Sequence, residues 1–317
     1  MPKPPLLALI VTFGLAFVVF AALAAGMNAT LKSVLAPLKG RALPTIGVLV
    51  ATFVVVPLAT GLTLDAFDFA AQATMAFALL SVVAGAPFVA LFTRIGRGDV
   101  AYAASVSLVQ LVLTIPFMPL VLPGMLTLLD VPHASVTTWH LLKPLLGFLL
   151  LPLAMGLAVR WRYPALAKEL APPCMQVAVV TVALHVILMF VAFWDDVVAE
   201  VHTGEYLYSV FMPVGCLILG FGCLLLMPGG ARAAGRDIRL PAALATAQRG
   251  SQALICSLIF AMGQYSVAGV VALGSSVITI VILVMLAAEI GRRPDRRPHR
   301  VDSPVAEAVA ASSAPAR

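Results

Sequence analysis

Polar residues cluster inside a long apolar segment near the C-terminal end of the chain. Gln248, Arg249, Ser251 and Gln252 occupy, with Gly250, five consecutive positions. A charge at the centre of a membrane helix costs about 2.5–3.5 kcal/mol on insertion scales, and such residues usually face a cavity or a partner. No acidic residue lies deep in any apolar segment, so Arg249 lacks an obvious counter-ion in the chain. The cluster therefore predicts an anion site. The alternative is that Arg249 reaches the interface or pairs with a neighbouring carbonyl.

A second apolar segment is interrupted in a similar way. Gly85 and Pro87 stand in the sequence Ala-Gly-Ala-Pro, and Gly98 follows Gly85 after 13 residues. Gly263 follows Gly250 at the same spacing. In transporters with inverted repeats, substrate binds near mid-membrane where such broken helices meet. The pattern predicts an inverted repeat with two discontinuous helices. The alternative is that these glycines only allow close helix packing.

The composition places most of the protein surface in lipid. Of 317 residues, 62% are hydrophobic and 11% are charged, whereas soluble domains carry about 25% charged residues. So few charges cannot cover a water-exposed surface. The long apolar runs show no period-2 alternation, which excludes a membrane barrel and leaves helices.

We therefore expect an all-α integral membrane protein of about nine transmembrane helices, each of roughly 20 residues. The expected spans lie near residues 5–25, 42–63, 69–93, 99–128, 137–160, 174–194, 205–227, 238–262 and 264–288. They form one transporter domain over residues 1–290. Residues 291–317, rich in Pro, Ala and Arg, are expected to be a disordered cytoplasmic tail. The first run is longer than a signal peptide's apolar region, which favours a retained span.

The distribution of Lys and Arg sets the expected orientation. These residues gather in the odd-numbered loops and the tail, whereas the even-numbered loops carry Asp and Glu without Lys or Arg. The N-terminus is thus expected outside and the C-terminus in the cytoplasm. The pI of about 9.4 follows from this topology and does not indicate nucleic-acid binding. The Ala-, Arg- and Pro-rich composition favours a bacterial inner membrane.

The spans lack the residue sets of an enzyme. They contain no metal-ligand cluster, acidic pair or nucleophile–base set, so we expect no catalysis and no cofactor. The four cysteines show no metal-like spacing and are expected to pack as small apolar residues. The expected partners are a small organic anion and the lipid bilayer. The sequence leaves the substrate and the oligomeric state open.

Several motifs, taken in order, resemble the bile acid:sodium symporter family. They are Gly26-Met27-Asn28-Ala29-Thr30-Leu31 after the first span, Pro57, the Gly98-Asp99 turn, and Gln-x-Gly-x-Gln from Gln248 to Gln252. The resemblance covers nearly the whole membrane region. It implies a core domain, in which two discontinuous helices cross, formed by expected spans 2, 3, 4, 7, 8 and 9. Expected spans 1, 5 and 6 would form a panel domain.

The resemblance also implies two sodium sites, from which this sequence departs. The family's acidic ligand corresponds to Gln248, and a glutamine from span 2 corresponds to Thr52. Gln252 keeps a family glutamine, and Ser107 keeps one of two hydroxyl ligands. Sodium, if bound, would therefore use oxygens of Gln248, Gln252 and Ser107, without a carboxylate.

We hypothesise that Arg249 supplies as a fixed charge what sodium supplies in relatives. Helix N-termini near Gly85 and Gly250 would add their dipoles to attract an anion. Transport of a small organic anion would then be independent of sodium. The alternatives are an ordinary sodium-coupled symporter and a receptor that binds a ligand without moving it.

Overall fold

The computed structural model is all-helical wherever it describes the chain, as the sequence predicts. It describes residues 4–30, 32, 34–35, 39, 41–67, 69–86, 88–131, 137–201, 205–226, 236–260 and 267–292. Within these ranges every regular element is a helix. Seven of the described helices are long and apolar enough to cross a membrane. The predicted tail beyond Arg292 lies outside the described residues.

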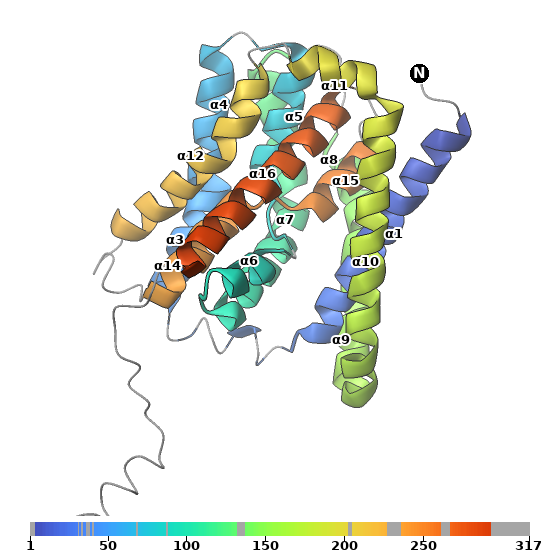
Figure 1. Cartoon of the computed structure of the whole chain (residues 1–317), viewed down its shortest axis with the longest axis vertical. Coiled ribbons are helices and arrows are strands. Elements are labelled where there is room, and N and C mark those ends of the chain that lie inside the picture. Colours follow the sequence, from blue (N-terminus) through green and yellow to red (C-terminus); the bar gives the residue numbers. More distant parts are fainter. Residues whose placement is uncertain are drawn as a thin grey trace, which may run out of the picture.

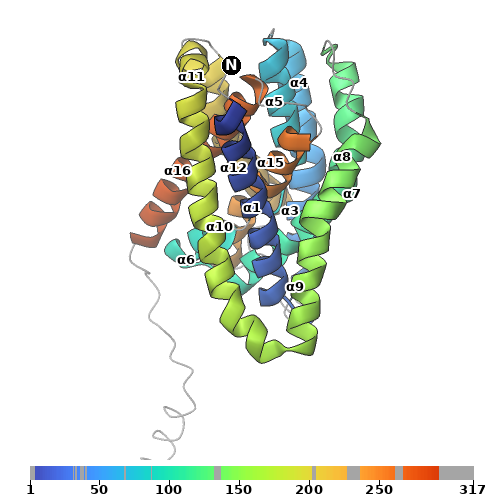
Figure 2. The same cartoon turned by 90° about the vertical axis from the view of Figure 1, so that its right-hand side faces the viewer.

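One group of helices stands at one side of the molecule. It comprises α1 (Pro4–Asn28), α8 (Thr138–Pro144), η2 (Leu145–Leu150), α9 (Leu151–Arg162) and α10 (Pro164–Ala192). Helix α1 packs along both α9 and α10 (Figures 1 and 2). The contact between α1 and α9 is very close, because a Cβ added to Gly26 would lie 3.0 Å from the Cα of Gly156. Paired glycines thus let these two backbones approach directly.

The remaining helices form a second, larger group. They are α3 (Ala42–Val50), η1 (Ala51–Val55), α4 (Val56–Ala66), α5 (Ala71–Val82), α6 (Val89–Ile95), α7 (Val100–Leu128), α12 (Glu205–Leu226), α14 (Arg236–Ala247), α15 (Ser251–Phe260) and α16 (Val267–Arg292). Helix α12 packs on α14, and α16 packs on α5. The short helix α11 (Trp194–Val201) connects α10 to this group. The two groups meet where α15 contacts α1 and η2.

Helix α10 begins ten residues before the start of the sixth expected span. The sequence placed its start at residue 174, after Pro172 and Pro173, but α10 begins at Pro164 and continues through both prolines. Proline is favoured in the first turn of a helix, which explains the start. A proline inside a helix frees the carbonyl four residues earlier. Here those carbonyls belong to Lys168 and Glu169, which are exposed, so solvent can bond them.

The helix ends that border the basic segments gather at one end of the molecule. Figure 1 places there the end of α1, the α6–α7 turn, the turn between α9 and α10, and the start of α14. This grouping is what the alternation of basic and acidic loops predicts. We call this the basic end below.

Candidate functional site

Two of the expected spans are interrupted, and their interruptions touch each other. Residues 83–88 separate α5 from α6, and residues 248–250 separate α14 from α15. A Cβ added to Gly250 would lie 2.9 Å from the carbonyl carbon of Ala84 and would overlap its oxygen. A side chain at this position would force the two segments apart. Glycine is therefore required for the crossing of these two broken helices.

The first interruption is fixed against helix α7. Gly85 has a φ of +79°, which other residues rarely adopt, and a Cβ there would lie 2.7 Å from that of Leu111. The backbone N–H of Ala84 donates to Thr114 Oγ1 at 3.1 Å, and that hydroxyl lies 3.3 Å from the carbonyl oxygen of Ala84. Thr114 thus satisfies backbone groups that the broken helix leaves unpaired.

Arg249 joins the C-terminal ends of α5 and α14, the half-helices that precede the two interruptions. Its Nη1 donates to the carbonyl oxygen of Ser81 at 3.3 Å, and its Nη2 donates to that of Thr246. Ser81 and Thr246 lie in the last turns of α5 and α14, where carbonyls lack partners within the helix. A cation at a helix C-terminus also interacts favourably with the helix dipole. Arg249 is only 5% exposed, so these interactions are little screened.

Gln110 is a second donor at the end of α14. Its Nε2 lies 3.2 Å from the carbonyl oxygen of Ala245 and 2.9 Å from Thr52 Oγ1 in the π-helical turn η1. The preceding carbonyl, of Leu244, accepts from the backbone N–H of Gln248 at 2.8 Å. Three successive carbonyls at this buried helix end, 244 to 246, are therefore bonded by protein donors.

Several buried polar atoms near the crossing have no hydrogen-bond partner among the described residues. They are Gln248 Oε1, Gln110 Oε1, Ser107 Oγ and Arg249 Nε. A buried polar atom without a partner is costly, and in a binding protein such atoms are candidates for ligand contacts. The crossing thus presents buried polar atoms that no other described residue bonds.

A cavity of about 360 Å³ lies beside the crossing, between the two helix groups. Gly85 and Ala86 of the first interruption line it, and α7 contributes Ser105 and Ser107. Asn28 at the end of α1 adds an amide, and most of the other lining residues are alanines. The volume and the mixture of apolar walls with a few polar groups are typical of small-molecule sites.

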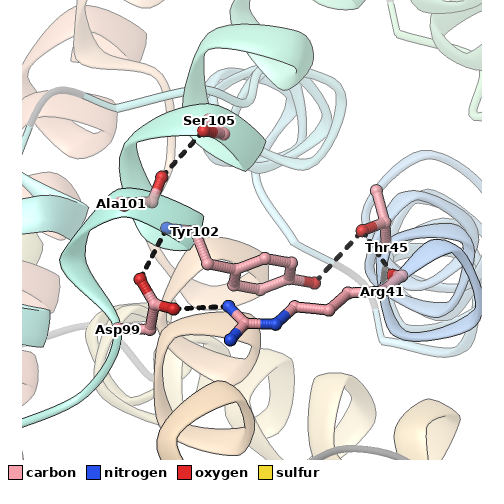
Figure 3. A network of polar contacts seen from close by, with 6 residues as sticks. All are labelled: Arg41, Thr45, Asp99, Ala101, Tyr102 and Ser105. Carbon is pink, nitrogen blue, oxygen red and sulfur yellow. Dashed lines mark hydrogen bonds and ion pairs between the residues drawn. The ribbon is translucent and has the colours of Figure 1, made fainter. Parts of the chain in front are cut away.

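A network of polar contacts links helices of the larger group at the basic end (Figure 3). Arg41 forms an ion pair with Asp99 and lies over the ring of Tyr102, 5.7 Å from its centroid. Asp99 caps α7 by accepting from the N–H of Tyr102 at 2.9 Å, and its own N–H donates to the carbonyl of Asp237 at 2.9 Å. Thr45 Oγ1 lies 3.5 Å from the Tyr102 hydroxyl. The network thus joins the starts of α3, α7 and α14.

The family model named sodium bile acid symporter family matches residues 10–200. This match covers more than half of the chain. The chain belongs to the sodium bile acid symporter family. No curated protein sequence matches it. The family match confirms the resemblance found in the sequence. Membership of this family supports an integral membrane transporter that takes a small organic anion.

The family's name implies sodium, so the fit of this crossing to the ion can be tested. Sodium is a hard cation that needs several oxygen ligands. Near the crossing, the described buried oxygens without a partner are those of Gln248, Gln110 and Ser107. The described residues contain no group of three or more His, Cys, Asp or Glu side chains that could hold a metal. The carbonyls of Ser81 and Thr246 already accept from Arg249. The described residues of the crossing therefore fit sodium poorly.

The predicted site residues divide into three groups. Arg249, Gln248, Gly250 and Thr52 meet at the crossing, whereas Gly85 and Ser107 also line the cavity. Arg249 does not line the cavity and instead pairs with carbonyls, which is the alternative that the sequence left open. Pro87 and the side chains of Ser251 and Gln252 lie outside the described residues.

The sequence analysis did not name the residues that α7 and α1 contribute to the crossing and the cavity. Gln110 and Thr114 hold the two interruptions, yet neither was predicted as a site residue. Together with Ser107 they follow the spacing i, i+3, i+7, which places them on one face of α7. That polar stripe in an apolar helix was a usable signal. Asn28 was noted only as part of a motif.

Proposed function

We propose that this protein is a secondary transporter that moves a small organic anion by alternating access. The proposal takes the two interrupted segments as complete spans, which gives nine transmembrane helices arranged as an inverted repeat. The group of α1, α8, η2, α9 and α10 would form the panel domain, and the larger group the core domain. The crossing of the interruptions at Gly250 and Ala84, with a cavity beside it, supports this arrangement.

The proposed substrate cavity opens between core and panel, closer to the basic end. Asn28 and Ser105 lie toward that end, whereas α15 contacts α1 and η2 on the other side of the crossing. Under the positive-inside rule the basic end is cytoplasmic, with the N-terminus outside, in a bacterial inner membrane. The cavity's apolar walls suit a substrate with an apolar body and a single anionic group.

We further propose that transport does not depend on sodium. The observation that carries this proposal is the pairing of Arg249 with carbonyls of both half-helices. A guanidinium is always charged and presents several donors in a fixed plane. It can therefore hold together the two negative helix ends, as a bound cation would, and its field favours an anion nearby. Unlike an ion, it cannot be released on one side of the membrane.

Uptake into proteoliposomes tests both parts of the proposal. A panel of labelled small carboxylates would be offered to the reconstituted full chain in sodium chloride and in choline chloride. We expect saturable uptake of at least one of them at equal initial rates in the two salts. Arg249→Gln should abolish it, while Lys143→Gln, which removes an exposed cation elsewhere, should not. Normal uptake by Arg249→Gln would refute the role of Arg249.

A sodium-coupled symporter is the second candidate, and one observation favours it. Gln248 Oε1 and Ser107 Oγ are buried acceptors without partners, as ligands of an absent ion would be. In that case uptake, or thermal stability, should rise with sodium and not with choline. The third candidate is a receptor that does not transport. It predicts that one of the tested small carboxylates raises the thermal stability of the protein but shows no saturable uptake.

A further inference from the structure

The turn between α9 and α10 carries an alternation of basic and aromatic residues. Arg160, Trp161, Arg162 and Tyr163 follow one another, and Lys168 comes about one turn into α10. Trp161 is 88% exposed and Tyr163 56% exposed. The Arg162 guanidinium lies 5.4 Å from the centroid of the Tyr163 ring. We call these five residues the hairpin tip.

The hairpin tip reaches beyond the apolar core of a membrane. Helix α10 has 29 residues and so spans about 43 Å, whereas the hydrocarbon core is about 30 Å thick. Figures 1 and 2 show that this turn projects past the other helix ends at the basic end. The tip therefore lies at the depth of the lipid headgroups, where Trp and Tyr are enriched.

The basic side chains of the tip are not neutralised by the described part of the protein. Arg160 donates to the carbonyl of Pro164 at 3.4 Å, but no described carboxylate forms an ion pair with Arg160, Arg162 or Lys168. The one acidic residue nearby in sequence is Glu169, also exposed. Three cations against one carboxylate leave a net positive tip at the headgroup level. An anionic headgroup supplies the complementary charge.

We propose that the hairpin tip binds anionic phospholipid headgroups. The guanidinium groups pair with lipid phosphates in bidentate geometry, and the Trp161 and Tyr163 rings lie among the headgroups. Since α1 packs along both α9 and α10, this contact holds the three helices at a fixed depth in the bilayer. It thereby gives the larger helix group a fixed wall to move against.

Quenching of tryptophan by brominated lipids tests the proposal with an internal control. The chain has three tryptophans, so Trp139→Phe with Trp194→Phe leaves Trp161 as the only reporter. Trp139→Phe with Trp161→Phe leaves Trp194, which is 60% exposed and precedes Asp195 and Asp196. The full chain would be reconstituted in mixtures of phosphatidylcholine and phosphatidylglycerol, with bromine on one lipid at a time.

We expect brominated phosphatidylglycerol to be enriched around Trp161 roughly two- to fivefold, which is the effect of about one basic residue near a surface. No enrichment is expected around Trp194. The preference should fall as salt rises and disappear in Arg160→Gln/Arg162→Gln/Lys168→Gln. Glu169→Gln should increase it. Equal quenching by the two lipids at Trp161, or a preference that survives the triple substitution, would overturn the proposal; unchanged melting in phosphatidylcholine confirms that the variants fold.

Discussion

Gly250 lies against the backbone of Ala84, so that two segments far apart in sequence touch without an intervening side chain. A Cβ on Gly250 would be 2.9 Å from the carbonyl carbon of Ala84 and 3.2 Å from its nitrogen. This contact brings the C-terminal ends of α5 and α14 within reach of one guanidinium. The glycine and the arginine next to it therefore act together, because the first permits the approach that the second stabilises.

The contact predicts a strong effect of the smallest substitution. Gly250→Ala should destabilise the protein by about 1–3 kcal/mol, the usual cost of overpacking a tight interior. Gly274→Ala is the matched control, since a Cβ there meets no atom within 4 Å. Because Gly274 lies inside α16, this substitution should leave stability unchanged or raise it by up to about 1 kcal/mol. Thermal unfolding in one detergent would compare the two. Similar melting of both variants would show that the crossing is looser than described.

Restoring a carboxylate at the crossing should restore a response to sodium. The variant Gln248→Glu/Arg249→Gln removes the guanidinium and places a carboxylate at position 248. The family resemblance implies an acidic ligand at this position in sodium-coupled relatives. We expect sodium, and not choline, to stabilise this variant, by about 2.7 kcal/mol at 100 times the dissociation constant. The control is Arg249→Gln alone, which lacks the carboxylate and should not respond. A sodium response in the wild type would contradict the idea that Arg249 replaces the ion.

The fold was largely predictable from the sequence, because apolar runs mark the helices and the basic loops mark the helix ends that lie together. The interruptions at Gly85 and Gly250 were predicted from paired glycines and polar residues, and both segments are broken in the structure. The continuation of α10 through Pro172 was not predicted. Its freed carbonyls lie where solvent can reach them, and that depends on how far the helix projects. Span number and repeat symmetry stay predictions.

The site was less predictable, since its bonds join residues that are far apart in sequence. Arg249 was singled out by its charge, but nothing local indicates that its partners are the carbonyls of Ser81 and Thr246. Backbone acceptors leave no trace in the sequence. Gln110 was visible as a polar residue in an apolar run, yet its role depends on α14 ending beside it.

Gln110 should behave as a shared partner of Thr52 and of α14. Gln110→Leu leaves the Ala245 carbonyl and the Thr52 hydroxyl buried without this donor, which should cost about 1–3 kcal/mol. Thr52→Val removes only one of these contacts and should cost less. In the double variant the effects should not add, because both substitutions break the same hydrogen bond. Additive losses in thermal unfolding would show that the two side chains act independently.

Asp99 should give the protein a defined sensitivity to acid. Burial raises the pKa of its carboxyl. Hydrogen bonds from Arg41 and from the Tyr102 N–H, together with the charge of Arg41, lower this pKa by more than burial raises it. The pKa therefore lies below its ordinary value of 3.8. The folded state therefore favours the ionised form. This stabilisation is fully present above the unfolded-state pKa and is lost as the pH falls through the folded-state value. Asp99→Asn should lower the melting temperature at pH 7 and flatten its dependence on pH below about 4. Asp65→Asn, at the other end of the bundle, is the control; if it flattened the profile equally, the effect would not come from the Arg41 ion pair.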